Sequence, residues 1–403
     1  MDIWQEALAV EDYVIQCRRF VHENPELSDQ EDGTVAFIIK ELTAMGVECD
    51  DVPGGGVMGY IHGAKPGKSV LLRADIDALP VQEATVNVHG EPKACVSKVP
   101  GVSHACGHDT HVAMLLGAAK ILQAHQDELS GEIVLYFERG EEHGHGDYYM
   151  VKYLQDQKIH VDSAFALHIK SSLRTGTIGL ISGGIYAGNT GTGVTIYGEN
   201  ALACGVAVIN GLNTARMRDM NPYENVTLSV NLLQYRDGVC KIGGTCRYYD
   251  WDKAGTPMRE AIFRIIRETV DAYGCTTAKP VKRAGGTRGS INNEVCYEIA
   301  KSAMTKILGA DNIVTHQPSM GAESFSILAS YYPSFYASLG GGHPDKPLVT
   351  VGHSPLFDPD EAAFKTGVAA HVAYALEFLA YDKPIEFTPF VGTIDEYLEA
   401  NRR

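Results

Sequence analysis

The sequence predicts a mixed α/β fold in which a sheet is covered by helices and a smaller α/β domain is inserted. Strand-like apolar runs alternate with helical periodicity through roughly the first 180 residues, which is typical of a mixed or parallel sheet covered on both faces. Ligand-type side chains follow several of these runs, where such sheets place their sites. A chain of 403 residues is long enough for two domains.

The first part of the chain carries most of the strand and helix signals. Residues 1–45 are helical in pattern, with a break at Asn24 and Pro25 and a second helix near 34–45. Gly54, Gly55 and Gly56 indicate a turn. Apolar runs then predict strands at 57–61, 69–72, 133–137 and 163–169, and a helix at 112–125.

The residue composition of the chain changes near residue 185, in the glycine-rich run G-G-I-Y-A-G-N-T-G-T-G. The pattern beyond it predicts strands at 194–197, 226–233 and 239–248 and helices at 201–217 and 257–273. A second glycine patch near 285–289 is expected to return the chain to the first domain, which a helix at 292–308, a strand at 334–339 and a helix at 360–379 complete. We therefore predict one discontinuous domain, 1–185 with 286–403, and an inserted domain at 186–285.

Composition narrows the function classes. The formal net charge of −16 argues against nucleic acid or an anionic membrane as the main partner. The nine cysteines are odd in number and scattered, which favours reduced thiols in a cytoplasmic protein. The acidic start M-D-I-W-Q-E lacks a signal-peptide pattern, and no apolar run approaches the ~18 residues of a membrane span, so we expect neither secretion nor insertion.

The strongest chemical signal is H-A-C-G-H-D-T-H at 104–111. Cys106 and His108 lie two residues apart, so a short stretch of backbone can aim both at one ion. Thiolate and imidazole suit zinc, and imidazole also binds manganese and other transition metals. Asp109 could orient an imidazole through its second ring nitrogen. The alternative is a polar loop with an incidental cysteine.

Other loops and strand ends offer further ligand-type groups: Asp75 and Asp77 in R-A-D-I-D-A-L-P, the adjacent Glu141 and Glu142, His168 and His353. One carboxylate of an adjacent pair can bind metal while the other takes a proton from the water that the metal activates. Each group also has a structural interpretation: a core histidine, a loop cap, turn carboxylates or an acidic helix start. His22 is interpreted as structural, and His143 and His145 as exposed.

Several motifs occur together and in a fixed order. They are R-R-F-V-H-E-N-P-E-L-S (18–28), R-A-D-I-D-A-L-P (73–80), H-A-C-G-H-D-T-H (104–111), E-E (141–142), L-H (167–168), M-G-A-E-S-F-S (320–326) and H-S-P-L-F (353–357). With them the chain resembles the metal-dependent amidohydrolase and aminoacylase family of metallopeptidases. The nearest branch holds auxin-conjugate hydrolases, hippurate hydrolase and bacterial N-acyl-amino-acid amidohydrolases.

The resemblance implies a zinc-peptidase-like catalytic domain interrupted by a lid that mediates homodimerisation. It implies one or two divalent ions, manganese or zinc, held by Cys106, His108, Glu142, His168 and His353. Glu141 would be the general base, Asp77 would orient a ligand, and Asp75 would be a further contact. The implied partner is a small-molecule substrate.

The departures from the family lie where substrate would be recognised. The inserted domain lacks the histidine that polarises the scissile carbonyl in the family, and it keeps Arg247 from the usual motif ending. Arg139 stands beside the glutamate pair, either as a surface ion pair with Glu138 or Glu141 or as an anchor for an anionic group on the substrate. Glu323 is kept as a candidate substrate contact, although Ser324 replaces the usual aspartate after it.

The sequence therefore favours a metal-dependent hydrolase of a C–N bond, with an N-acyl amino acid or similar carboxylate-bearing molecule as substrate. One alternative keeps the metal and the base but deaminates an electron-poor aromatic amine such as 5-nitroanthranilate, an activity found in the wider family. The second alternative is a catalytically weak binding protein that retains the fold, because the lid is altered.

Overall fold

The computed structural model describes residues 1–278 and 285–402, which form two compact units. The first unit comprises Met1–Ser182, Asn292–Gln317 and Tyr331–Pro389, and the second comprises Gly183–Ile291, Pro318–Ser330 and Phe390–Arg403. Segments 318–330 and 390–403 thus group with the second unit, whereas the sequence predicts that all of 286–403 belongs to the first domain. Part of the predicted boundary near 285 lies outside the described residues.

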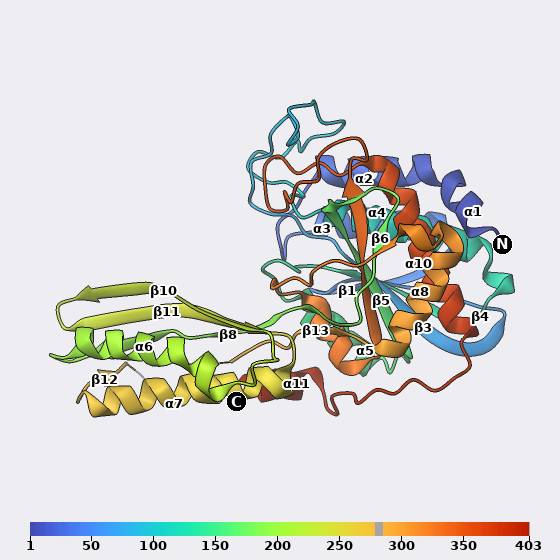
Figure 1. Cartoon of the computed structure of the whole chain (residues 1–403). Coiled ribbons are helices and arrows are strands. Elements are labelled where there is room, and N and C mark those ends of the chain that lie inside the picture. The colour runs from blue at the N-terminus through green and yellow to red at the C-terminus, as the bar shows by residue number, and fades with distance from the viewer. Residues whose placement is uncertain (279–284, 403) are drawn as a thin grey trace. The chain divides into compact units, whose positions relative to one another are not determined.

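The first unit, in which Figure 1 labels β1, β3, β4, β5 and β6, is built on one mixed sheet. The strand order of this sheet is β1-β2-β4-β3-β5-β15-β6-β14. Its strands are β1 (Glu48–Val52), β2 (Gly56–His62), β3 (Lys65–Asp75), β4 (Ser130–Glu138), β5 (Ser163–Arg174), β6 (Ile178–Gly179), β14 (Ile313–Val314) and β15 (Ser334–Gly342). β3 pairs in parallel with both β4 and β5, and β5 pairs in parallel with β15. The carboxyl ends of these central strands therefore share one edge.

Helices cover this sheet: α1 (Ile3–Ala9), α2 (Glu11–Glu23), α3 (Asp32–Ala44), α4 (His108–Ala124), α5 (Gly146–Asp156), α8 (Glu294–Leu308) and α10 (Phe364–Ala380), with 3-10 turns at Gln126–Glu128, Ala310–Asn312 and Glu361–Ala363. Both α4 and α10 pack on β3, α3 packs on β1 and β2, and α8 packs on β15. Nearly every residue of α4 is buried. The predicted sheet covered by helices is confirmed.

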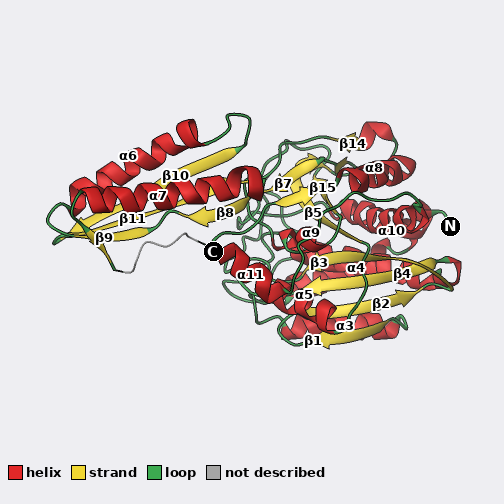
Figure 2. Ribbon diagram, turned by 90° about the horizontal axis from the view of Figure 1, so that it is seen from below, coloured by secondary structure: helices red, strands yellow, loops and turns green. Residues whose placement is uncertain are grey.

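The second unit has its own sheet, ordered β10-β11-β9-β12, with β8 also pairing with β11. Its strands are β7 (Gly183–Tyr186), β8 (Gly188–Gly191), β9 (Val194–Tyr197), β10 (Val226–Arg236), β11 (Val239–Tyr248), β12 (Thr276–Thr277) and β13 (Ser290–Asn292). Its helices are α6 (Ala201–Asp219), a π-helical turn (Trp251–Gly255), α7 (Thr256–Ala272), a 3-10 turn (Ser324–Ser326), α9 (Leu328–Tyr331) and α11 (Ile394–Arg402). The last residues of β13 and α9 fall in the first unit. Figure 2 shows α6 and α7 lying side by side along this sheet. The apolar side chains between them form a separate core.

Helix length and polarity also bear on membranes. Within the described ranges, each helix is too short or too polar to cross a bilayer.

Candidate metal centre and active site

The candidate residues converge at the carboxyl ends of the parallel strands. Asp75 is the last residue of β3, and Glu141 and Glu142 follow β4 by three and four residues. His168 lies on β5, where its register partner on β15 is Ser338. Such strand ends are where open α/β sheets hold their ligands.

The start of α4 brings Cys106 and His108 to the same place. Gly107 between them has φ +100°, a left-handed conformation that glycine adopts without steric cost. A Cβ on this residue would also lie 2.6 Å from Cγ2 of Ile169. Both the positive φ and the close contact with Ile169 therefore favour glycine at this turn, which directs the Cys106 and His108 side chains to one place.

The five residues predicted to hold metal form overlapping groups whose ligand atoms lie within 4.8 Å of one another. These groups are Cys106–His108–His168, Cys106–Glu142–His353 and His108–Glu141–Glu142. Cys106 Sγ is 3.3 Å from His168 Nε2, and His353 Nε2 is 3.2 Å from Glu142 Oε1. The structure thus brings together the predicted ligands and the predicted base.

The chemistry of these donors fits a divalent cation. His108 Nε2 is buried and has no hydrogen-bond partner among the described residues, and a buried polar atom of this kind requires one. Burial raises the pKa of the Cys106 thiol above its ordinary range. A cation is the group that would satisfy the imidazole and hold the sulfur as thiolate.

Neighbouring acceptors fix the imidazole tautomers. The Asp77 Oδ1 carboxylate oxygen is 3.0 Å from His108 Nδ1, and the Ile169 carbonyl oxygen is 2.7 Å from His168 Nδ1. Because both oxygens only accept, each Nδ1 carries the proton and each Nε2 presents its lone pair. This is how carboxylates and carbonyls commonly orient metal-binding histidines.

Asp77 connects three parts of the site. Its Oδ1 accepts from His108, while its Oδ2 accepts from the Glu142 amide at 3.0 Å and from the Ser28 hydroxyl at 2.6 Å. Burial alone would raise the pKa of Asp77, but these hydrogen bonds outweigh it and hold the pKa below its ordinary value. An ionised Asp77 therefore orients one ligand and fixes the backbone of another.

Asp75 and His111 form a buried pair beside this cluster. Asp75 accepts from Arg73 Nη1 at 2.8 Å and from His111 Nδ1 at 2.5 Å. The Ile169 amide donates to His111 Nε2 at 3.1 Å, so both ring nitrogens of His111 are already used. We therefore assign His111 to the support of β5, although its ligand atoms lie close to those of Asp75 and His108.

His22 and Asp109 also lie outside the ligand set. Asp109 Oδ2 is 2.8 Å from His22 Nδ1 and accepts from Arg18 Nε at 2.8 Å. The second ring nitrogen of His22 is 3.0 Å from Glu83. The imidazole that Asp109 orients is thus His22, in a buried network behind the motif.

The predicted substrate-binding residues have partners of other kinds. Arg139 Nη2 donates to Asp32 Oδ1 at 2.6 Å, an ion pair with a partner that the sequence analysis did not name. Arg247 Nη1 donates to the Met320 carbonyl at 2.6 Å, and Glu323 Oε1 accepts from the Phe325 amide at 3.2 Å. Arg247 and Glu323 belong to the second unit. Their role toward substrate stays a prediction.

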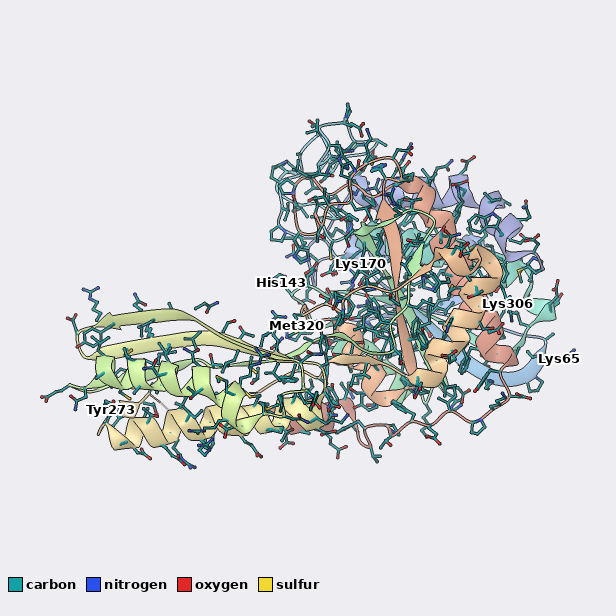
Figure 3. The ribbon with its side chains drawn as sticks, in the orientation of Figure 1. Lys65, His143, Lys170, Tyr273, Lys306 and Met320 are labelled. Carbon is teal, nitrogen blue, oxygen red and sulfur yellow. The ribbon has the colours of Figure 1, made fainter. Side chains whose placement is uncertain are left out.

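Sequence reasoning missed Ser28 and Glu31, which support the site. Ser28 closes the motif R-R-F-V-H-E-N-P-E-L-S, and Glu31 accepts from the Gly140 amide at 2.8 Å. The motif signalled that the region matters, but a hydrogen bond across some fifty or a hundred residues leaves no spacing pattern. His143 and His145 are exposed, as expected (His143 is labelled in Figure 3).

Known proteins resemble this chain over nearly its whole length. The model of Peptidase family M20/M25/M40 matches residues 71–377. Thermostable carboxypeptidase 2 of Saccharolobus solfataricus is 33% identical over 391 residues, covering 92% of this chain and 96% of that protein. IAA-amino acid hydrolase ILR1-like 6 of Arabidopsis thaliana is 32% identical over 380 residues, covering 90% and 79%.

A solved structure agrees. The YXEP protein of Bacillus subtilis, a dinuclear metal binding peptidase from the M20 family, matches with a TM-score of 0.75 and 27% identity over 92% of this chain and 99% of that one. The predicted family resemblance is confirmed by these matches. The chain belongs to peptidase family M20/M25/M40, and it is an enzyme that hydrolyses C–N bonds.

Proposed function

We propose that this enzyme hydrolyses the amide bond of an N-acyl amino acid or a similar small carboxylate-bearing molecule. The observation that carries the proposal is the Glu141–Glu142 pair, whose ligand atoms lie within 4.8 Å of those of His108. Two adjacent carboxylates beside one imidazole allow one to bind a cation and the other to move a proton.

The proposed ligands are Cys106, His108, Glu142, His168 and His353. Because the ligand groups overlap and share Cys106, His108 and Glu142, we propose two divalent ions, manganese or zinc. A bound divalent ion lowers the pKa of water and polarises a carbonyl oxygen. Glu141 would take the proton of the attacking water and return it to the leaving amine.

Relatives support this substrate class. One is named a carboxypeptidase and another an IAA-amino acid hydrolase, and both names describe release of an amino acid. We propose Arg247 and Glu323 as substrate contacts. The Asp32 ion pair favours the interpretation of Arg139 as part of the structure around the glutamate pair.

A substrate panel tests the proposal. We expect turnover of N-acyl amino acids in the presence of manganese or zinc. Glu141→Gln should lower kcat by about a hundredfold or more, the usual effect of losing a general base, while metal content is kept. Glu132→Gln, an exposed glutamate on β4, is the matched control and should keep full activity.

Other outcomes would contradict the proposal. Full activity of Glu141→Gln would exclude that residue as the base. Ammonia release from an electron-poor aminobenzoate, without turnover of acyl amino acids, would establish the deaminase alternative. Absence of bound divalent ions by elemental analysis would favour the binding-protein alternative.

We also propose that residues 1–185 and 286–403 carry catalysis and that 186–285 mediate a homodimer. β10 ends the sheet order of the second unit, and among the described residues it pairs with β11 alone. Leu232 and Leu233 on β10 are about half exposed. An exposed apolar edge strand is a ready template for a second copy. Light scattering should give a dimer for the wild type and a monomer for Leu233→Lys.

We further propose a cytoplasmic location. All nine cysteines are free, although Cys204, Cys240 and Cys275 are buried in one core of the second unit. Free thiols of this number are typical of a reducing compartment. Fractionation of cells that express the natural protein is the test.

A further inference from the structure

The loop that carries Glu141 has little regular structure of its own. β4 ends at Glu138, and residues 139–145 form irregular turns and bends before α5 begins at Gly146. Gly140 sits there with φ +65°, and the Gly144 amide donates to its carbonyl oxygen at 2.9 Å. A catalytic base on such a turn keeps a fixed position only if neighbouring segments hold the turn.

Glu31 holds this turn directly. The Gly140 amide donates to Glu31 Oε1 at 2.8 Å, and the Glu31 side chain is fully buried. Its second oxygen, Oε2, has no hydrogen-bond partner among the described residues. Burial raises the pKa of Glu31 to about 7. Burying a carboxyl group costs free energy unless the group is well paired. The hydrogen bond to the Gly140 amide is the contact that offsets part of this cost.

Glu31 stands at the position where a side chain would ordinarily cap α3, yet its carboxyl group makes no capping bond. Glu26 caps the helix instead, accepting from the Gly33 amide at 3.0 Å and the Thr34 amide at 2.7 Å. Because Glu26 caps the helix, the Glu31 carboxyl group is available to accept from the Gly140 amide. It also fixes the first turn of α3 against which the loop rests.

Two further contacts join the same segments. Asp32 pairs with Arg139, and Asp29 Oδ1 accepts from the His145 amide at 3.3 Å. Asp29 adopts φ +64°, a conformation uncommon outside glycine. Asp32 and Glu31 therefore hold the start of the loop 139–145, at Arg139 and Gly140, and Asp29 holds its end at His145.

We propose that Glu31 is a positioning residue for catalysis: its acceptor oxygen holds the Gly140 amide and so aims Glu141 at the reacting water. This inference rests on the proposed function, in which Glu141 is the base. A base displaced by about 1 Å can lose up to a hundredfold in rate, whereas substrate binding need not change.

The test compares two variants at this position in the metal-loaded protein. Glu31→Ala removes the acceptor, and we expect kcat to fall ten- to a hundredfold with KM within about twofold. Glu31→Gln keeps an acceptor oxygen, and we expect kcat within about threefold of the wild type. Glu41→Ala is the matched control: Glu41 lies on α3, which follows Glu31, its side chain accepts from Tyr13, and the variant should keep the wild-type kcat.

Amide hydrogen exchange gives a second readout that does not depend on activity. Peptides covering 139–145 should exchange faster in Glu31→Ala than in the wild type, and Glu31→Gln should restore slow exchange. Should Glu31→Ala fail to fold, Glu31→Asp, which shortens the side chain and withdraws the acceptor, replaces it in both measurements.

The outcomes separate the two proposals. Unchanged kcat or unchanged exchange in Glu31→Ala would overturn the positioning role, as would equal losses in the alanine and glutamine variants. A wild-type enzyme that turns over none of the acyl amino acids would instead overturn the proposed function, and exchange would then decide whether Glu31 holds the loop.

Discussion

Asp77 shows how one buried carboxylate can order a site. It accepts hydrogen bonds from His108, from the Glu142 amide and from Ser28, so the three groups share one anchor. An ionised carboxylate can accept all three hydrogen bonds, because both of its oxygens are acceptors and it carries no donor that would face another donor. The orientation of two proposed ligands therefore depends on a residue that need not touch the metal.

Replacing Asp77 by asparagine tests this dependence. The side-chain amide of the variant would have to present a donor toward one of the three groups that now donate to the carboxylate. We expect divalent-metal affinity to fall ten- to a hundredfold, the usual effect of losing a carboxylate that supports a metal-binding histidine. Competition with a chelator measures the affinity. Ser28→Ala removes one donor while keeping the carboxylate, and a loss as large as that of D77N would contradict the argument.

Cys106 predicts how metal affinity depends on pH. Burial raises the pKa of its thiol, so in the metal-free protein the sulfur keeps its proton at neutral pH. A cation must displace that proton, and binding therefore releases at least one proton from this residue. We expect affinity to rise at least about tenfold per unit between pH 6 and 8, measured by calorimetry. An affinity independent of pH would contradict Cys106 as a ligand.

At the scale of elements, the turn before α4 decides whether the two motif ligands meet. Gly107 has a positive φ and lies against Ile169, so Gly107→Ala introduces both backbone strain and a clash. We expect the variant to lose about 1–3 kcal/mol of unfolding free energy and to bind metal more weakly. Denaturation and metal titration measure the two effects. Gly101→Ala, at a positive φ with open space around it, separates strain from the clash.

The same elements show what sequence could and could not predict. The strand β4 and the helix α4 were predicted because both carry local runs of apolar residues, which core elements need and which a sequence shows directly. β1, with the sequence E-C-D-D-V, was not predicted because a polar edge strand lacks that pattern. Cys106 and His108 were found by local spacing. Glu31 was not, because its partner Gly140 is distant in sequence and contributes only a backbone amide.

At the scale of the first unit, a buried chain of charges links the N-terminal helices to the metal-site motif. Arg18 donates to Asp109, Asp109 contacts His22, and His22 contacts Glu83. Lys93 completes the chain by donating to Glu83 at 2.7 Å. Buried charges of this kind are tolerated only when each has its partner, so removing one member strands the others.

Glu83 gives this network a testable pH dependence. Burial would raise its pKa, but His22, Lys93 and the Ser97 amide outweigh it and lower the pKa to about 2. A carboxyl group with a lowered folded-state pKa stabilises the fold above its unfolded pKa, and this contribution disappears as pH falls from about 4.5 toward 2. Glu83→Gln should therefore cost about 3 kcal/mol of unfolding free energy at pH 7 and progressively less below pH 4.5.

Denaturant unfolding of both proteins across this pH range makes the comparison. Protonation of the metal ligands destabilises wild type and variant alike, so the difference between the two curves isolates Glu83. The exposed Glu132→Gln serves as the control and should unfold like the wild type at every pH. A difference between wild type and E83Q that stays constant from pH 7 to pH 3 would show that the carboxylate charge contributes nothing, and that the network is held by packing around Arg18 and His22 instead.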